Sequence, residues 1–172
     1  PRKLWLNNIK LTQEMDGAGK AVYGDMRIGT SGEASIDPVW TQFNLASYLL
    51  GKGHHNALKI RALIELPSDT GIYWPPEFEN AKGIGSPCTL MTQVTGNAGS
   101  ENALYIREYT NGAAAVNASL TTAYSTTLPS GSYKNLYGTA INANVTLQPS
   151  TGFVYLKTSG FGCGGVSTPP PP

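Results

Sequence analysis

A proline-rich stretch, residues 67–87, holds most of the side chains that could bind a sugar. Tyr73 and Trp74 offer aromatic faces to the apolar side of a sugar ring, and the neighbouring polar side chains could bond its hydroxyl groups. Its prolines deny a central strand its donors, and its aromatic content argues against disorder. We expect a ligand-binding loop here, unless Trp74 only packs the loop onto the fold. The candidate ligand-binding residues are Asp69, Tyr73, Trp74, Glu77 and Asn80.

The same stretch contains two carboxylates that could be taken for a glycosidase pair. A glycosidase holds its two carboxyl groups about 5 to 9.5 Å apart across the scissile bond. Glu77 and Glu79 stand two residues apart on one segment, which does not predict that arrangement. Hydrolysis is therefore the lesser alternative.

The adjacent histidines His54 and His55 stand just before a predicted strand, at a rim of the fold. Neighbouring side chains of an extended chain point in opposite directions, so the two do not form a ready metal site. The chain has no third histidine. We expect a turn here, count His54 among the ligand-binding candidates, and predict no metal or other cofactor.

Other catalytic signatures are missing from the sequence. There is no Gly-x-Ser-x-Gly motif, and the glycine-rich residues 160–165 lack the lysine or helix that would cradle a phosphate. The sequence therefore predicts a protein that is not an enzyme.

The two cysteines, Cys88 and Cys163, have no metal-ligand spacing. They form either one disulfide or two buried thiols. The residues after Glu108 are rich in serine, threonine and asparagine and poor in charge, as is common on secreted β proteins. This favours the disulfide, because disulfides occur mainly in oxidising compartments.

The composition limits the fold and the partners. The chain of 172 residues has 13% charged residues and a net charge of +1, which provides no electrostatic attraction for nucleic acid. Twenty glycines and twelve prolines favour strands and turns. No apolar run reaches transmembrane length, so we expect no membrane insertion.

Alternation of apolar and polar residues predicts about nine short strands. The clearest are Leu58–Leu66 and Ile141–Leu147, and a parity change within Leu4–Leu11 predicts a bent first strand with a bulge. Residues Leu45–Leu50 could instead form a helical turn ended by Gly51. Such strands predict an all-β antiparallel sandwich or barrel. The weaker strand candidates are Ala21–Ile28, Val39–Leu45, Thr89–Thr95, Leu104–Tyr109, Val116–Thr122 and Phe153–Lys157.

The stretch Leu128-Pro129-Ser130-Gly131-Ser132-Tyr133, followed by the strand Ile141–Leu147, resembles the end of domains in bacterial chaperone–usher pili. In such a corner, the tyrosine ring covers the end of the sandwich and its hydroxyl binds a backbone group. Together with the cysteine pair and the terminal prolines, the chain is similar to the receptor-binding (lectin) domain of a two-domain tip adhesin.

This resemblance implies an elongated immunoglobulin-like sandwich over residues 1–165 and a proline-rich linker over residues 166–172 that leads to a pilin-like domain. The implied function is attachment without catalysis, through a host glycan or glycoprotein, from the pilus tip outside the cell. The pilin-like domain would engage the next pilus subunit, a periplasmic chaperone and an usher. The alternatives are a secreted carbohydrate-active enzyme, a carbohydrate-binding module, or a structural subunit without a ligand.

The loop hypothesis predicts the effect of Trp74→Ala. Ligand binding should be lost while the melting temperature stays nearly unchanged, because a ring that serves the ligand contributes little to packing. Thermal unfolding and a binding assay on the same preparation test this. A collapse of stability with binding unaffected would assign the ring to the fold instead.

Overall fold

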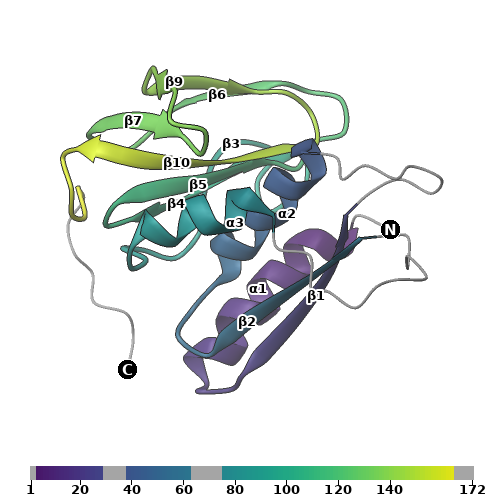
Figure 1. The fold of residues 1–172 in the computed structure, drawn as a ribbon. Coiled ribbons are helices and arrows are strands. Elements are labelled where there is room, and N and C mark those ends of the chain that lie inside the picture. The colour runs from purple at the N-terminus through teal and green to yellow at the C-terminus, as the bar shows by residue number, and fades with distance from the viewer. Residues whose placement is uncertain (1–2, 29–37, 63–74, 165–172) are drawn as a thin grey trace.

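The computed structural model describes residues 3–28, 38–62 and 75–164 (Figure 1). The chain is mostly β, as expected, but the described part of its first third contains two helices, for which the sequence analysis offered only a helical turn over Leu45–Leu50 as an alternative. Asp69, Tyr73 and Trp74, together with the linker 166–172, lie outside the described residues.

The N-terminal part is an α/β unit. Helix α1 (Lys3–Gly17) leads to strand β1 (Val22–Ile28), and helix α2 (Pro38–Gly51) connects β1 to strand β2 (Asn56–Ala62). The two strands are parallel, in register from Val22 opposite Asn56 to Ile28 opposite Ala62. Both strands therefore end at the same edge.

The remaining part begins with helix α3 (Pro76–Ala81) and a 3₁₀ turn (Lys82–Ile84), and continues as antiparallel sheets. A six-stranded sheet has the order β3-β4-β5-β10-β7-β8, and β6 pairs with β9 in a separate sheet. The strands are β3 (Thr92–Gly96), β4 (Ala103–Tyr109), β5 (Gly112–Asn117), β6 (Tyr124–Thr127), β7 (Ser132–Asn135), β8 (Ala140–Ile141), β9 (Asn144–Leu147) and β10 (Thr151–Ser159).

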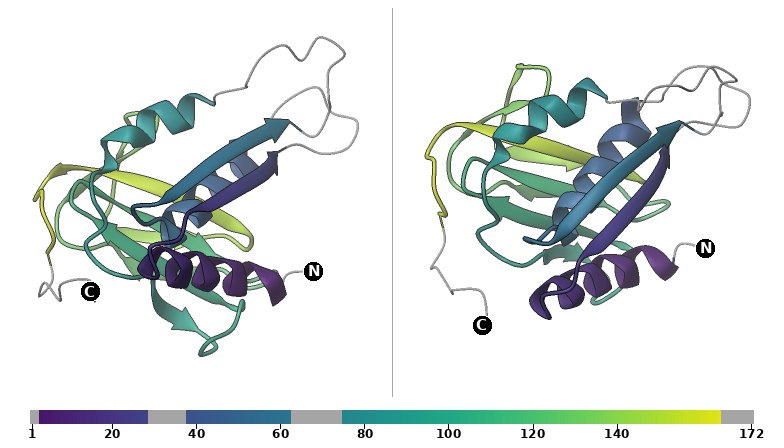
Figure 2. Two further views of the ribbon diagram at one scale, coloured as in Figure 1. Left: turned by 90° about the horizontal axis from the view of Figure 1, so that it is seen from below. Right: turned by 60° about the horizontal axis from the view of Figure 1, so that its bottom comes forward.

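The six-stranded sheet lies between two apolar cores. Helix α2 covers one face through strands β10, β5 and β4. The β6–β9 sheet covers the other face, where Leu104, Tyr133 and Leu147 are buried together. Figures 1 and 2 show the β1–β2 pair on the far side of α2 from the antiparallel sheets. This order of strands does not establish the immunoglobulin-like topology.

The expected first strand over Leu4–Leu11 is wrong, because the segment is part of α1. Leu6 and Ile9, three positions apart, are both buried, and this spacing places them on one face of a helix. The parity change interpreted as a bulge is this helical spacing.

The expected strand over Val39–Leu45 is also wrong, because these residues begin α2. Leu45, Leu49 and their neighbours are buried at helical intervals. The alternative of a helical turn ending at Gly51 was the better one, and the turn extends into a full helix.

Most other strands lie where they were predicted, including β1, β3, β4 and β10. The start of the predicted Leu58–Leu66 strand is β2. The predicted Ile141–Leu147 strand is interrupted and forms β8 and β9. The predicted Val116–Thr122 strand is mostly wrong, because only Val116 and Asn117 belong to a strand, the end of β5, and residues 118–122 form no strand. The tyrosine corner is confirmed: the buried Tyr133 donates its hydroxyl hydrogen bond to the Pro129 carbonyl at 2.9 Å.

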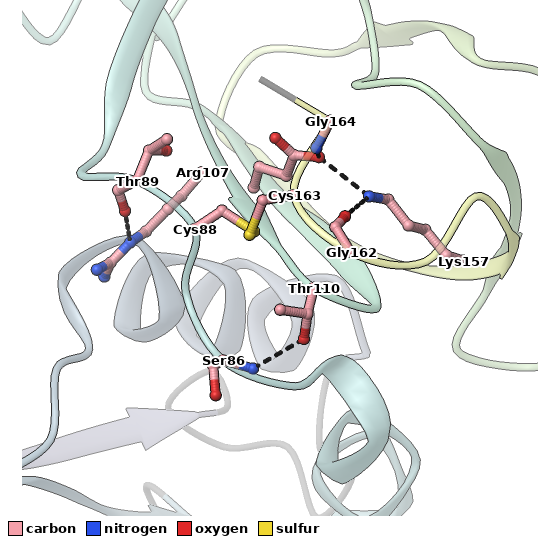
Figure 3. The surroundings of a disulfide bond; sticks show 10 residues. Ser86, Cys88, Thr89, Arg107, Thr110, Lys157, Gly162, Cys163 and Gly164 are labelled. Carbon is pink, nitrogen blue, oxygen red and sulfur yellow. Dashed lines mark hydrogen bonds and ion pairs between the residues drawn. A yellow bond between two sulfur atoms is a disulfide. The ribbon is translucent and has the colours of Figure 1, made fainter. Parts of the chain in front are cut away.

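The disulfide between Cys88 and Cys163 is confirmed, with an S–S distance of 2.04 Å (Figure 3). It joins the segment before β3 to the segment after β10. A buried ion pair supports this junction: Lys157 Nζ lies 3.0 Å from Glu108 Oε1, and the same oxygen accepts a hydrogen bond from Gly164 N. The antiparallel part is thereby closed covalently at its two ends.

Arg107 on β4 connects the sheet to the end of α2. Its guanidinium, on a side chain that is almost fully buried, donates to the carbonyls of Leu49, Leu50 and Lys52 and, on its other side, to Thr89 O. The last carbonyls of a helix have no partner within the helix, and Arg107 supplies donors to them together with Tyr109, which donates to Leu49 O, and Gln13, which donates to Leu50 O. Burial lowers the pKa of Arg107, but an arginine keeps its charge.

Arg107→Met should lower the free energy of unfolding by about 2 to 3 kcal/mol, because it removes the buried charged donor of four hydrogen bonds to the backbone, while Tyr109 and Gln13 still donate to Leu49 O and Leu50 O. Arg107→Lys should recover only part of this, since an ammonium group cannot reproduce the planar fork. Urea unfolding measures both, with Lys10→Met on the exposed side of α1 as control. A loss of less than about 1 kcal/mol in Arg107→Met would contradict this role.

Candidate functional site

Glu77 and Asn80 are the predicted ligand-binding residues that the structure brings together, on helix α3. Pro75 and Pro76 begin this helix, since proline suits the first turn where no intrahelical donor is needed. Glu77 is only 6% exposed, whereas Asn80 is exposed. The helix therefore directs one of these side chains inward and one toward solvent.

The buried Glu77 carboxylate holds a tyrosine that sequence reasoning missed. Tyr137 donates its hydroxyl hydrogen bond to Glu77 Oε1 at 2.6 Å. Gln42 of α2 donates to the same hydroxyl from its side-chain nitrogen at 3.5 Å. Three separate segments thus converge on one phenolic oxygen.

The Tyr137 ring remains open to solvent, with the residue 55% exposed. It lies in the turn between β7 and β8, where Asn135 Oδ1 accepts hydrogen bonds from the backbone N–H groups of Tyr137 and Thr139. Gly138 adopts a φ of 88°, which favours glycine. We give the name tyrosine platform to the exposed Tyr137 ring together with Glu77 and Gln42, the two residues that bind its hydroxyl.

Asn80 positions the same turn from the helix side. Its side-chain nitrogen donates to the Leu136 carbonyl at 2.9 Å. Asn80 therefore joins α3 to the residue before Tyr137.

The pKa of Tyr137 is raised to about 12, first by partial burial and then by the hydrogen bond to Glu77 and its negative charge. The phenol therefore keeps its proton at neutral pH and continues to donate to Glu77. This keeps the ring in one orientation.

Glu77 and Glu79 do not face each other as a catalytic pair would. Glu77 is buried against Tyr137, whereas Glu79 is exposed and pairs with Lys82 at 2.6 Å along the same helical segment. The two carboxylates thus have different partners and surroundings.

His54 is not part of this site. It is exposed in the turn before β2, whereas the segment that leads to α3 leaves the other end of β2. Beside it, Asp16 accepts the backbone hydrogen bond of His55 and lies 3.4 Å from its Nδ1 atom. Among the described residues, no group of three His, Cys, Asp or Glu side chains could hold a metal ion.

Tyr137 and Gln42 could not be singled out in the sequence. Gln42 stands in a segment interpreted as a strand, and Tyr137 is one of nine tyrosines. A usable signal was the run Asn135-Leu136-Tyr137-Gly138, because asparagine and glycine favour a turn that exposes the aromatic residue between them.

Comparison of the chain with known protein-family models, curated proteins and solved structures found no match. Within the described ranges, no helix has the length and apolar character needed to cross a bilayer.

The raised pKa of Tyr137 predicts a stability change at alkaline pH. An unfolded tyrosine ionises near pH 10.0, while the folded one holds its proton until about pH 12. The contribution is therefore complete below pH 10.0 and is lost as the pH rises toward about 12. Urea unfolding across this range should show a smaller decline for Tyr137→Phe than for the unchanged protein.

Other buried tyrosines also contribute to this decline, so the difference between the two proteins is the informative quantity. Equal pH dependence in both would show that Tyr137 ionises in the folded protein as it does in the unfolded chain. Glu77→Gln should give an intermediate result, because it removes the negative charge and keeps a hydrogen-bond acceptor.

Proposed function

We propose that this chain is a non-enzymatic carbohydrate-binding protein that works outside the cytoplasm, and that the tyrosine platform is part of its binding surface. The observation that carries the proposal is an exposed aromatic ring whose hydroxyl is held by a buried carboxylate. A ring fixed in this way loses little conformational freedom when a ligand stacks on it.

The chemistry of the surroundings supports a sugar. The face of a tyrosine ring accepts the apolar C–H side of a sugar ring, while hydroxyl and amide groups at the edge bind the sugar hydroxyls. Thr139, in the same turn as Tyr137, and Asn80, which binds the Leu136 carbonyl, are exposed and offer such groups. The Cys88–Cys163 disulfide supports an oxidising compartment.

The resemblance to pilus tip adhesins gives this proposal its most specific form. In that form the ligand is a host glycan or glycoprotein, the protein lies at the pilus tip on the cell surface, and a pilin-like domain joins it to the pilus subunit, the periplasmic chaperone and the usher. The confirmed Tyr133 corner supports the part of the resemblance carried by residues 128–133.

A part of a secreted carbohydrate-active enzyme is the second candidate. The observation that favours it is the parallel β1–α2–β2 unit, whose strands end together at Ile28 and Ala62. In α/β proteins, ligands bind beyond the carboxyl ends of parallel strands.

A glycan array, together with a panel of extracellular-matrix proteins, tests the proposal on the full chain. We expect glycan binding that is about tenfold weaker in Tyr137→Ala, since an aromatic contact contributes up to about 1.5 kcal/mol. Tyr137→Phe keeps the ring and should retain most of the affinity.

Circular dichroism and thermal unfolding of both variants serve as controls for folding. Unchanged binding by a folded Tyr137→Ala protein would remove the platform from the binding surface. Absence of binding to both panels would favour a structural subunit without a ligand, and release of reducing sugar from a bound glycan would favour the enzyme.

A further inference from the structure

A second site lies apart from the tyrosine platform, where the α/β unit meets the antiparallel sheet. It is a hollow of about 70 Å³ lined by side chains from α1, α2, the β3–β4 connection and the residue after β5. Its lining residues are Trp5, Trp40, Phe43, Glu101 and Ala118. We call it the aromatic hollow.

Aromatic rings form its walls and hold one another in place. Trp40 meets Phe43 edge to face, with ring centroids 5.7 Å apart. Phe43 lies 6.4 Å from Trp5, which lies 5.6 Å from Tyr105 behind it. The Trp5 indole N–H also donates to Ser47 Oγ at 3.0 Å, so the orientation of this ring is fixed by both packing and a hydrogen bond.

Glu101 adds a negative charge to the hollow. One of its carboxylate oxygens accepts a hydrogen bond from Leu6 N at 3.2 Å, which fixes the side chain beside the first turns of α1. The pKa of Tyr105 is raised by burial and then by the charge of Glu101, in agreement with a carboxylate close to these rings.

The size of the hollow limits what can enter. A water molecule occupies about 30 Å³ in the liquid, and a cavity of about 150 Å³ holds benzene. A space of about 70 Å³ therefore accepts one or two methyl-sized groups at the tip of a ligand and excludes a whole sugar ring.

The negative electrostatic potential of the residues that line the hollow favours a cationic ligand. The faces of aromatic rings carry negative electrostatic potential and attract ammonium groups, with tryptophan the most effective. A carboxylate beside them adds to this attraction and repels anions.

We propose that the aromatic hollow is a cation subsite that receives the tip of an alkylammonium group. The tip lies between Trp5, Trp40 and Phe43, and Glu101 balances its charge. The inference is independent of the tyrosine platform, since none of these four residues contacts Glu77 or Tyr137 in the hydrogen bonds that define that site.

Two probes of the same shape test the charge requirement: choline and its neutral carbon isostere 3,3-dimethylbutan-1-ol. Each is titrated into the full chain at constant ionic strength, and the indole N–H signals of Trp5 and Trp40 are followed by NMR. Choline should shift both signals and bind at least about fivefold more tightly than the isostere, as a cation–π contribution of about 1 kcal/mol predicts.

Two variants separate the contributions of charge and ring. Glu101→Gln keeps an acceptor for Leu6 N and should weaken choline binding at least about fivefold, as the loss of one close charge predicts. The matched control Glu79→Gln removes an exposed carboxylate on α3 and should leave choline binding unchanged. Trp40→Leu should reduce binding further while the dispersed signals of the remaining residues report an intact fold.

Several results would overturn the cation subsite. One is the absence of any shift at either indole with choline up to about 100 mM, a concentration that detects even weak sites. Another is equal binding of choline and the neutral isostere, which would make the hollow a purely apolar one. A third is equal loss of choline binding in Glu101→Gln and Glu79→Gln, which would indicate a nonspecific charge effect.

Discussion

The hydrogen bonds from Arg107 and Tyr109 to the end of α2 hold the two parts of this protein together. Arg107 donates to three carbonyls at the end of the helix, and Tyr109 donates its hydroxyl to one of them, Leu49 O. Both side chains come from β4 and are buried. Because a buried carbonyl without a donor is costly, these bonds determine where α2 lies on the six-stranded sheet.

The position of α2 in turn determines both candidate sites. Gln42 reaches the Tyr137 hydroxyl, while the next residue, Phe43, turns about 100° around the helix axis and lines the aromatic hollow. Helix α2 thus contributes Gln42 to the tyrosine platform and Phe43 to the aromatic hollow. A shift of α2 would disturb both sites, so the buried contacts at its far end matter for binding.

The other end of the antiparallel part depends on the Cys88–Cys163 disulfide and the buried Lys157–Glu108 ion pair. Glu108 follows Arg107 directly on β4 and points to the opposite face of the sheet, as neighbouring residues of a strand do. Strand β4 therefore binds the α/β unit through one face and the segment after β10 through the other.

The sequence indicated most strands of the antiparallel part and the Tyr133 corner, because alternation and turn residues are local signals. It favoured the disulfide between Cys88 and Cys163, the chain's two cysteines, over two buried thiols, and the structure decided for the disulfide. Sequence reasoning failed for α1 and α2, where an apolar pair such as Leu6 and Ile9 fits a bulged strand as well as a helix. Only packing against the sheet decides between the two. The grouping of Glu77 with Asn80 was predicted from their proximity in the chain. Their junction with Gln42 and Tyr137 was decided by the tertiary structure, because it joins residues as many as 95 positions apart, and no local pattern encodes such a contact.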